Sequence, residues 1–297
     1  MAIWSSTLHS AVCPQNGPAD PAELARTIAR DARSRRGLLL FADFDAVFGH
    51  GDRKEPRAKL PLLMRGALVA LATTPDTRVV VSSGEDASDL ETYINVPGVV
   101  YAGCRGLQIR GGGMMFSHPV AARSRDLLPL LARELLDSLA PLPGVEVEIK
   151  EFGVGVHVRD VDPDAVPVIV AQAEELIRTL APEFRVWSSE STVDVFPDVD
   201  WRMGSSVLWI LGRWMCEREG CPVVVYLGSG DTDEETYGEL KRYGYAIRVG
   251  RPGDGSASSH WVADQTAAVD LLGRLAFTWS VQSHDRERVE ESAGPAT

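Results

Sequence analysis

Short apolar runs that end abruptly in polar residues constrain the fold of this chain more than any other feature. The segment GLLLFADFD (37–45) breaks from apolar residues into two carboxylates, Asp43 and Asp45. The segments TRVVVSSGE (77–85) and CPVVVYLGSGD (221–231) likewise end in small polar residues and an acid. Continuous apolar runs of this length are typical of parallel strands buried on both faces. Helical periodicity between them predicts an α/β fold with a doubly wound parallel sheet and a site at the strand carboxyl ends.

A different pattern interrupts this alternation in the middle of the chain. A helical segment (about 120–139) precedes 145–161, whose alternating polar and apolar residues predict one long, half-exposed strand. A helix over 162–180 and two short strands follow. We therefore predict an α+β domain inserted into the α/β core. The predicted divisions are an N-terminal arm and helix at 1–35, the core at 36–117 and 200–280, the inserted domain at 118–199, and a charged, flexible tail at 281–297.

The chain is acidic, with a formal net charge of −12 at pH 7. A protein that binds nucleic acid or an anionic membrane surface needs a basic patch, so neither partner is expected. No apolar run approaches the ~20 residues that span a bilayer, and the first residues lack the pattern of a signal peptide. The cysteines form no Cys-x-x-Cys pair, which is typical of reduced thiols. These observations predict a cytoplasmic protein.

Several short motifs are informative because of the order in which they stand. They are Asp-x-Asp at Asp43–Val47, Ser-Gly at Ser83–Glu85, a glycine-containing turn at Gly103–Gln108, charged pairs at Glu148–Lys150 and His157–Arg159, a helix start at Met203–Gly204, and an acidic turn at Gly228–Glu234. In this order the motifs resemble those of the trehalose-phosphatase branch of the haloacid-dehalogenase (HAD) superfamily. The resemblance covers roughly residues 35–280, and it implies a HAD-like core with the inserted domain as a cap.

Asp43 and Asp45 match the two catalytic acids of that family. The resemblance implies that Asp43 attacks phosphorus to form an aspartyl-phosphate, while Asp45 is first general acid and then general base. It also implies that Asp43, the backbone carbonyl of Asp45 and a carboxylate of the last motif hold Mg²⁺. From the residues alone a second interpretation stays open, in which the two acids cap the turn that follows the strand.

The last motif departs from the family pattern. Ser229 and Gly230 replace its paired carboxylates, so a magnesium ligand is lost unless Asp231 or Asp233 reaches the site through a shift of the loop. For Asp233 and Glu234 we favour a place in the turn that opens the next helix, where acids suit the helix dipole. We therefore expect the magnesium site to be degenerate.

The positions that match the phosphate-binding residues are changed in part. Ser83 and Gly84 match the family's phosphate-binding turn, and Arg105, in the turn after the third strand, is a further candidate for binding the substrate. Met203 replaces a lysine that neutralises the phosphate in the family. The adjacent Arg202 would either supply that charge or remain a solvated side chain. Loss of the lysine and of a magnesium carboxylate is expected to cost several kcal/mol of transition-state stabilisation, so altered chemistry is predicted.

The inserted domain carries residues that match positions near the family's sugar site. Alternation along a strand places Glu148 and Lys150 on one face, and His157 and Arg159 likewise share a face. Charged groups of this kind form bidentate hydrogen bonds with a sugar, and the alternative is a solvated strand face. Three tryptophans would stack on a sugar, although core packing is the more usual role: Trp187, Trp201 and Trp209.

Three functions stay open at this point. The first is a hydrolase derived from sugar-phosphate phosphatases that acts on a sugar phosphate or a related sugar-like substrate. The second is a metal-independent enzyme in which Asp43 and Asp45 cleave or rearrange a glycosyl bond. The third is a non-catalytic protein that binds a sugar.

Overall fold

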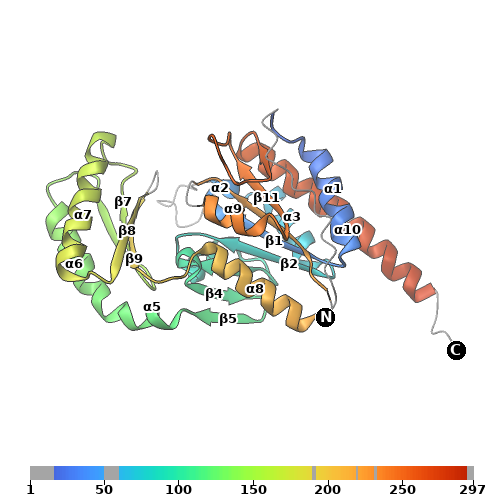
Figure 1. Cartoon of the computed structure of the whole chain (residues 1–297), viewed down its shortest axis with the longest axis horizontal. Coiled ribbons are helices and arrows are strands. Elements are labelled where there is room, and N and C mark those ends of the chain that lie inside the picture. Colours follow the sequence, from blue (N-terminus) through green and yellow to red (C-terminus); the bar gives the residue numbers. More distant parts are fainter. Residues whose placement is uncertain (1–16, 50–59, 189–191, 219, 231–232, 293–297) are drawn as a thin grey trace.

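Two β-sheets with their helices make up the computed structural model, which describes residues 17–49, 60–188, 192–218, 220–230 and 233–292 (Figure 1). The larger sheet contains β1 (Leu38–Asp43), β2 (Thr77–Ser82), β3 (Val100–Gly103), β4 (Gln108–Gly111), β5 (Met114–Ser117), β10 (Val223–Gly228), β11 (Gly244–Val249) and β12 (His260–Val262). Its order is β12-β11-β10-β1-β2-β3-β4-β5, parallel from β12 to β3 and antiparallel from β3 to β5. The predicted parallel sheet is confirmed, and the hairpin of β4 and β5 extends it.

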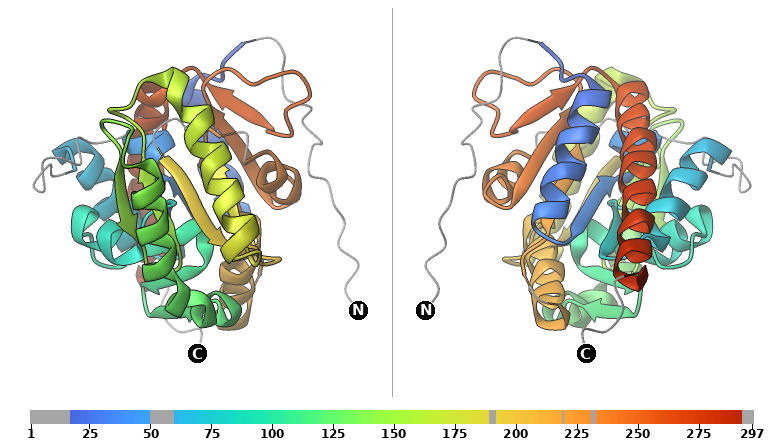
Figure 2. Two further views of the ribbon diagram at one scale, coloured as in Figure 1. Left: turned by 90° about the vertical axis from the view of Figure 1, so that its left-hand side faces the viewer. Right: turned by 90° about the vertical axis from the view of Figure 1, so that its right-hand side faces the viewer.

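Helices cover both faces of the larger sheet, because successive residues of a strand point to opposite sides. In β1, Leu38 and Leu40 pack into one layer, whereas Leu39 and Phe41 pack into the other. The first layer contains α1 (Pro21–Ser34), α3 (Leu62–Thr73), α4 (Ala87–Ile94) and α10 (Gln265–Ser292), and the second contains α8 (Met203–Glu217) and α9 (Glu234–Leu240). Helices α1 and α10 lie side by side (Figure 2). The central strands are therefore buried on both faces, as their apolar runs predict.

The start of α1 and the end of α10 differ in how well the sequence predicts them. The helix predicted within residues 1–35 is α1, which starts with Asp20 accepting a 2.8 Å hydrogen bond from the backbone N–H of Glu23 and with Pro21 in the first helical position. Helix α10 continues to Ser292, although we predicted a flexible tail from residue 281. No described helix is both long enough and apolar enough to cross a membrane.

The smaller sheet and two helices form a unit that we call the inserted module. It contains α6 (Leu128–Leu139), β6 (Glu146–Ile149), β7 (Val154–His157), α7 (Val166–Leu180), β8 (Phe184–Ser188) and β9 (Thr192–Pro197), with the strands in the order β6-β7-β9-β8. Valines of β7 and β9 pack against α6 and α7 on one face. Figure 1 shows both helices on the side of this sheet that is farther from the larger sheet. The opposite face is therefore directed toward the larger sheet.

The prediction of one long strand over 145–161 is wrong. The chain turns between Lys150 and Gly153, where the backbone N–H of Lys150 donates to the carbonyl of Gly153 at 2.8 Å, and β6 and β7 pair as an antiparallel hairpin. A Cβ atom at Gly153 would lie 2.5 Å from the carbonyl oxygen of Val195, so a residue with a side chain does not fit at this position. The alternation therefore belongs to two short strands.

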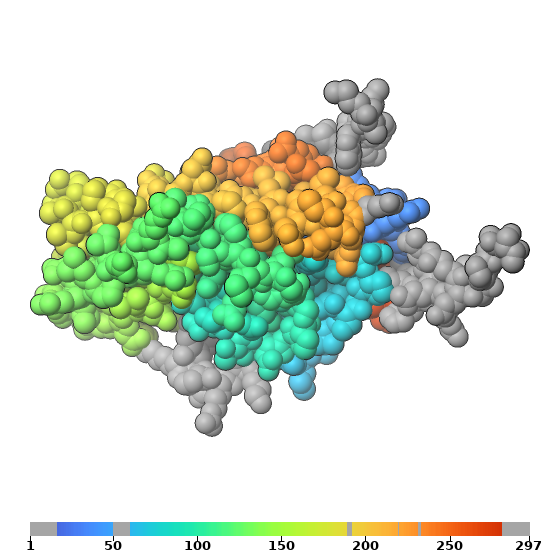
Figure 3. Space-filling model, turned by 90° about the horizontal axis from the view of Figure 1, so that it is seen from below, coloured from blue at the N-terminus to red at the C-terminus, as the bar shows by residue number. Residues whose placement is uncertain are grey.

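A cluster of aromatic and apolar residues joins the module to the core. Phe152 and Phe196 of the module are buried against Cys104 and Leu107 of the core. Beside this cluster, the ring of Phe116 in β5 lies 5.0 Å from that of Trp209 in α8, measured between centroids. The space-filling view shows the green surface near residues 115–125 in contact with the orange surface of α8 (Figure 3).

Candidate active site

Strand β1 delivers its carboxylates to the edge of the sheet that faces the inserted module. It ends at Asp43, and the short helix α2 (Phe44–Phe48) follows directly. Asp43 Oδ1 accepts a 2.9 Å hydrogen bond from the backbone N–H of Ala46 and so caps α2, while Asp45 lies in the first turn of that helix. The capping interpretation therefore describes Asp43 in this structure. A carboxylate has a second oxygen, so capping and chemistry are compatible.

Asp233 lies in this site, although the sequence favoured a place for it in the turn that opens the next helix. It precedes α9 and is buried, with 8% of its surface exposed. Asp233 Oδ1 accepts a 2.8 Å hydrogen bond from the hydroxyl of Tyr226, and Oδ2 accepts one of 2.9 Å from the backbone N–H of Gly230. Gly228 makes room for it, because a Cβ atom there would lie 2.5 Å from Asp233 Oδ2. The acidic turn at Gly228–Glu234 therefore contributes a carboxylate to the interior, two positions beyond Asp231, which lies outside the described residues.

Asp43 and Asp233 act on each other electrostatically across neighbouring strands. Burial raises the pKa of Asp43 well above its ordinary value, and the negative charges of Asp233 and Asp45 raise it further. Burial also raises the pKa of Asp233, against the hydrogen bonds from Tyr226 and Gly230. Two acids that repel one another in a desolvated site favour a cation between them. Both acids follow apolar runs that were predicted to be parallel strands, and parallel strands end at the same edge of a sheet. This reasoning could have indicated the pair.

The turn after β2 and the loop after β3 are tied together at the same edge of the sheet. The hydroxyl of Ser83 accepts a 3.2 Å hydrogen bond from the backbone N–H of Glu85. The N–H groups of Cys104 and Arg105 donate to the carbonyls of Glu85 and Ser83, at 2.7 and 3.1 Å. Cys104 and Arg105 have φ angles of 50° and 57°, which are uncommon for residues with side chains. Such backbone conformations persist where the surrounding structure requires them, and they concentrate at functional sites.

Arg105 lies between the core carboxylates and the inserted module. Its guanidinium carbon is 4.4 Å from the centroid of the Trp187 ring, which belongs to β8. Burial lowers the pKa of Arg105, while the negative charges of Asp194 and Asp233, and more weakly that of Asp43, oppose this shift. The predicted substrate-binding residue Arg105 thus acts electrostatically on Asp43, and it contacts a tryptophan that we expected to be a core or sugar-stacking residue.

The face of the module sheet that is not covered by helices is polar. Strand register aligns Glu148, Gly155, Asp194 and Trp187 in one row across the four strands. Glu148 Oε2 lies 2.9 Å from His157 Nε2, on the same face. The predicted pair of Glu148 and His157 is therefore brought together. Arg159 lies beyond the end of β7 and is exposed.

Lys150 connects the inserted module to the turn at Ser83–Glu85 of the core. Its ammonium group donates to Asp194 Oδ1 at 2.8 Å, to Glu85 Oε1 at 3.2 Å and to the carbonyl of Gly84 at 3.3 Å. Burial alone would lower the pKa of Lys150, but the charges of Asp194 and Glu85 hold it above its ordinary value. Glu85 therefore supplies a negative partner for a lysine that was predicted to bind sugar.

The remaining predicted residues lie at the margin of this site. Arg202 forms an exposed ion pair with Glu235, with 3.1 Å between Nε and Oε2. The ring of Trp201 stacks on that of Phe116, with 4.9 Å between centroids, and the ring of Trp209 also packs against Phe116, at 5.0 Å. Both tryptophans therefore pack within an aromatic cluster, which is the more usual role of this residue type.

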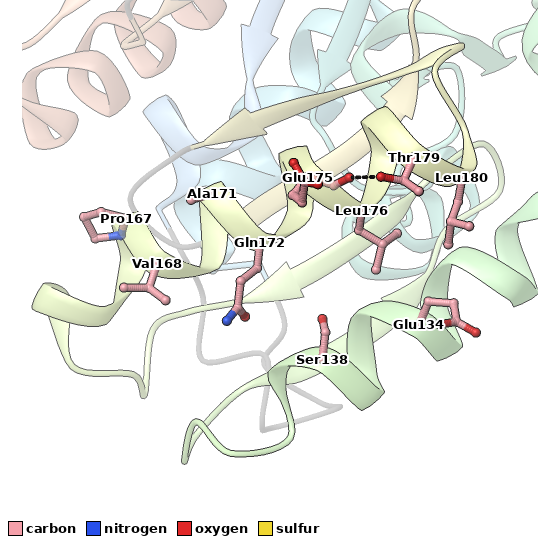
Figure 4. Close-up of a pocket in the computed structure, with 10 residues that line it drawn as sticks. All are labelled: Glu134, Ser138, Pro167, Val168, Ala171, Gln172, Glu175, Leu176, Thr179 and Leu180. Atoms are coloured by element: carbon pink, nitrogen blue, oxygen red, sulfur yellow. Dashed lines mark hydrogen bonds between the residues drawn. The ribbon is translucent and has the colours of Figure 1, made fainter.

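A separate groove lies on the outer face of the inserted module, between α6 and α7 (Figure 4). Its volume is about 760 Å³. Because α6 and α7 cover the apolar face of the module sheet, this groove is on the opposite side from the polar row. It is lined by Glu134, Ser138, Pro167, Val168, Ala171, Gln172, Glu175, Leu176, Thr179 and Leu180. No residue of the predicted site contributes to it.

The carboxylates fit a magnesium ion in part. Within the described ranges, no group of three or more His, Cys, Asp or Glu side chains is arranged to hold a metal ion. Magnesium, however, is commonly bound through one or two carboxylates, waters and the phosphate of the substrate. Asp43 and Asp233 supply two carboxylates whose mutual repulsion a divalent cation would relieve.

Comparison with known proteins shows the family of this chain. Residues 41–262 match the sequence profile of the family described as Trehalose-phosphatase. The chain belongs to the trehalose-phosphatase family. It is 33% identical over 254 residues to the trehalose-phosphate phosphatase of Mycobacterium bovis (strain BCG / Pasteur 1173P2), covering 83% of this chain and 63% of that protein. The corresponding protein of Mycobacterium avium (strain 104) is 30% identical over 263 residues, covering 86% of this chain and 66% of that protein.

Solved trehalose-phosphatase structures share the fold. The C-terminal domain of trehalose-6-phosphate phosphatase from C. albicans matches with a TM-score of 0.72 at 18% identity, covering 88% of this chain and 98% of that one. A trehalose-6-phosphate phosphatase related protein matches with a TM-score of 0.68 at 15% identity, covering 82% and 99%. The chain spans less than two thirds of the length of several curated trehalose-phosphatase relatives, for example 61% of that from Mycobacterium marinum. The HAD-like fold that the motifs implied is confirmed.

Proposed function

We propose that this trehalose-phosphatase family member hydrolyses the phosphate ester of a sugar or sugar-like substrate. The observation that carries the proposal is the convergence of Asp43, Asp233 and Arg105 at one edge of the parallel sheet, opposite the polar face of the inserted module. Curated relatives are named trehalose-phosphate phosphatases, so trehalose 6-phosphate is the first substrate to test.

The proposed reaction has two steps that use the same pair of acids. A carboxylate oxygen of Asp43 attacks phosphorus, and the bond between phosphorus and the sugar oxygen breaks as Asp45 gives that oxygen a proton. Asp45 then accepts a proton from water, whose oxygen attacks the phosphorus of the aspartyl-phosphate. This step releases inorganic phosphate and restores the carboxylate of Asp43, so protons and bonds balance over the cycle.

Asp43 and Asp233, together with the backbone carbonyl of Asp45, would hold Mg²⁺ in this site. When bound, the ion supplies positive charge that offsets the charge of the phosphoryl group. Asp233 would supply the carboxylate that Ser229 and Gly230 lack, because the acidic turn at Gly228–Glu234 keeps this one buried acid. A positive charge near Asp43 also favours its ionised form, which is the nucleophilic one.

The inserted module is proposed to act as the cap that binds the sugar. Glu148 and His157 lie on its polar face and present hydrogen-bonding groups toward the core. Lys150 is engaged with Asp194 and Glu85, so its contribution to sugar binding is proposed to follow from an exchange of these partners for hydroxyl groups. Arg159 is exposed and would contact a sugar at the margin of the polar face.

Phosphate release from trehalose 6-phosphate and glucose 6-phosphate, measured with and without Mg²⁺, tests this function. Asp43→Asn is expected to abolish turnover, because the amide is not a nucleophile, and Asp45→Asn is expected to slow it by about 10²- to 10⁴-fold. The matched control is Asp270→Asn, which changes an exposed carboxylate on α10 that pairs with Arg274. The proposal fails if the wild-type protein releases no phosphate under either condition, or if Asp43→Asn retains full activity.

A further inference from the structure

We propose that Arg105 is the cation that binds the phosphoryl group of the substrate, and that Trp187 of the inserted module holds its guanidinium in position. The inference rests on the proposed function and adds a residue role to it. It also makes phosphate binding depend on contact between the core and the module.

The backbone places Arg105 between two elements that border the nucleophile. Its N–H donates to the carbonyl of Ser83 at 3.1 Å, which fixes the loop to the turn after β2. On the other side, a Cβ atom at Gly106 would lie 2.9 Å from the side chain of Ser206, so the loop packs directly on the first turn of α8. Met203, which starts α8, brings a thioether to that turn and no positive charge. Arg105 therefore belongs to a loop that packs beside the start of α8, where Met203 replaces the lysine implied by the resemblance.

The charges around Arg105 agree with this role. A phosphate dianion that approaches Asp43 and Asp233 adds negative charge to a desolvated site that already contains two acids, so a fixed cation is required there. Arg105 acts electrostatically on both of these carboxylates. Its planar guanidinium also offers parallel N–H groups that match two phosphate oxygens, which an ammonium group does not.

The guanidinium carbon of Arg105 lies over the Trp187 ring, 4.4 Å from the ring centroid. This distance is within the range of cation–π attraction, and the contact leaves N–H groups of the guanidinium for a ligand. The indole Nε1 is buried and has no hydrogen-bond partner among the described residues, so the ring face rather than the N–H makes this contact. Because Trp187 belongs to β8 of the module, movement of the module would also release Arg105. Trp187 is thus a positioning residue.

The experiment combines two substitutions at each residue with a control. Arg105→Gly removes the guanidinium and also relieves the positive φ angle of 57°, so loss of folding is not expected. Arg105→Lys keeps the charge without the planar fork. Trp187→Phe keeps a ring face, and Trp187→Leu removes it. The control is Arg185→Gln, which alters an exposed arginine that lies 5.6 Å from the same indole and pairs with Asp198.

Two measurements are made on the full chain. Binding of inorganic phosphate is followed by isothermal titration calorimetry, and turnover is followed by phosphate release from trehalose 6-phosphate. Arg105→Gly is expected to weaken phosphate binding and to lower kcat/KM by about 100- to 1000-fold, with partial recovery in Arg105→Lys. Trp187→Leu is expected to raise KM by about tenfold and Trp187→Phe by a smaller factor, because a phenyl ring keeps part of the ring face, whereas Arg185→Gln stays within about threefold of wild type. Added guanidinium ion is expected to restore activity to Arg105→Gly and not to the Arg105→Gly/Trp187→Leu double variant.

Each outcome separates the inference from the function on which it rests. If wild type releases phosphate from trehalose 6-phosphate and Arg105→Gly does so equally well, the role of Arg105 is overturned while the function stands. Equal rescue of the single and the double variant overturns the role of Trp187. If wild type shows no turnover, the proposed function fails, and calorimetry still decides whether Arg105 binds phosphate. Absence of phosphate binding by the wild-type protein overturns the inference as well.

Discussion

Lys150 Nζ lies 2.8 Å from Asp194 Oδ1, and both residues are almost fully buried, with 3% and 6% of their surfaces exposed. The same ammonium group reaches Glu85 on the core side, at 3.2 Å. One buried cation therefore compensates an acid of the inserted module and an acid of the core. Because a buried charge without its partner is costly, this cluster ties the two parts of the molecule together.

Lys150→Met is expected to lower the free energy of unfolding by about 3–5 kcal/mol, because it leaves two acids without their counter-charge. Equilibrium unfolding in urea measures this quantity. Lys241→Met, at an exposed position, is the matched control and is expected to stay within about 0.5 kcal/mol of wild type. A loss of less than about 1 kcal/mol in Lys150→Met would show that solvent reaches the cluster and screens it.

Two buried tyrosines beside Asp233 are expected to respond oppositely to loss of the hydroxyl. Tyr226→Phe removes the donor to Asp233 Oδ1 and is expected to destabilise the protein by about 1–2 kcal/mol. Tyr237→Phe removes a hydroxyl that has no partner among the described residues, so its effect is expected to be neutral or slightly stabilising. Thermal unfolding of both variants measures the difference. Equal losses would contradict the assigned hydrogen bonds.

The raised pKa of Asp43 predicts a pH dependence of stability. Burial first, and then the charges of Asp233 and Asp45, raise this pKa above its unfolded value, so the folded protein holds a proton that the unfolded chain releases. The contribution of Asp43 to stability is therefore full below the unfolded pKa, about 4, and is lost as the pH rises through the higher folded pKa.

Asp43→Asn is expected to remove this dependence of stability on pH. The amide oxygen can still accept the hydrogen bond from the N–H of Ala46, and it carries no charge. The variant should be more stable than wild type at pH 7 and approach it at pH 4. Urea unfolding between these values, with Asp270→Asn as the control, checks the sign. A difference between wild type and Asp43→Asn that does not change with pH would overturn the assignment.

Gly155 is expected to be sensitive to a single methyl group. A Cβ atom there would lie 2.8 Å from Lys150 Cε and 3.2 Å from Asp194 Oδ1, so Gly155→Ala is expected to cost about 1–3 kcal/mol. Gly66→Ala is the matched substitution, because Gly66 is exposed in α3 with no atom near its Cβ position. This variant is expected to stabilise the protein by about 0.5–1 kcal/mol. Thermal unfolding of both proteins tests the contrast, and similar shifts would contradict it.

Much of the core could be predicted because burial on both faces leaves a direct mark on the sequence. The runs that end at Asp43 and Ser83 are apolar without interruption, and the structure places both at one sheet edge. The hairpin of β4 and β5 gave no such mark, because it is only partly buried and turns through three glycines with positive φ, Gly111 to Gly113. Its strands are too short for alternation to be informative.

The candidate site was predicted less completely than the fold. Asp233 was assigned to a helix start, and it does stand there, but spacing along the chain does not show that its side chain turns inward past Gly228. Lys150 and Glu148 were expected to act alike, and the turn at Gly153 gives them different surroundings. The partners that these side chains find, Asp43 for Asp233 and Glu85 for Lys150, lie far away in the sequence, and local patterns carry no information about such pairs.

The register of the module sheet has a consequence for how this protein tolerates change. Glu148, Gly155, Asp194 and Trp187 stand in one row only because all four strands keep their present alignment. A deletion of one residue within β9 would exchange its two faces, so Asp194 would enter the apolar interior and a valine would face the core. Folding and ligand recognition in this part of the chain therefore depend on the same strand register. Insertions and deletions are expected in its connecting loops rather than in its strands.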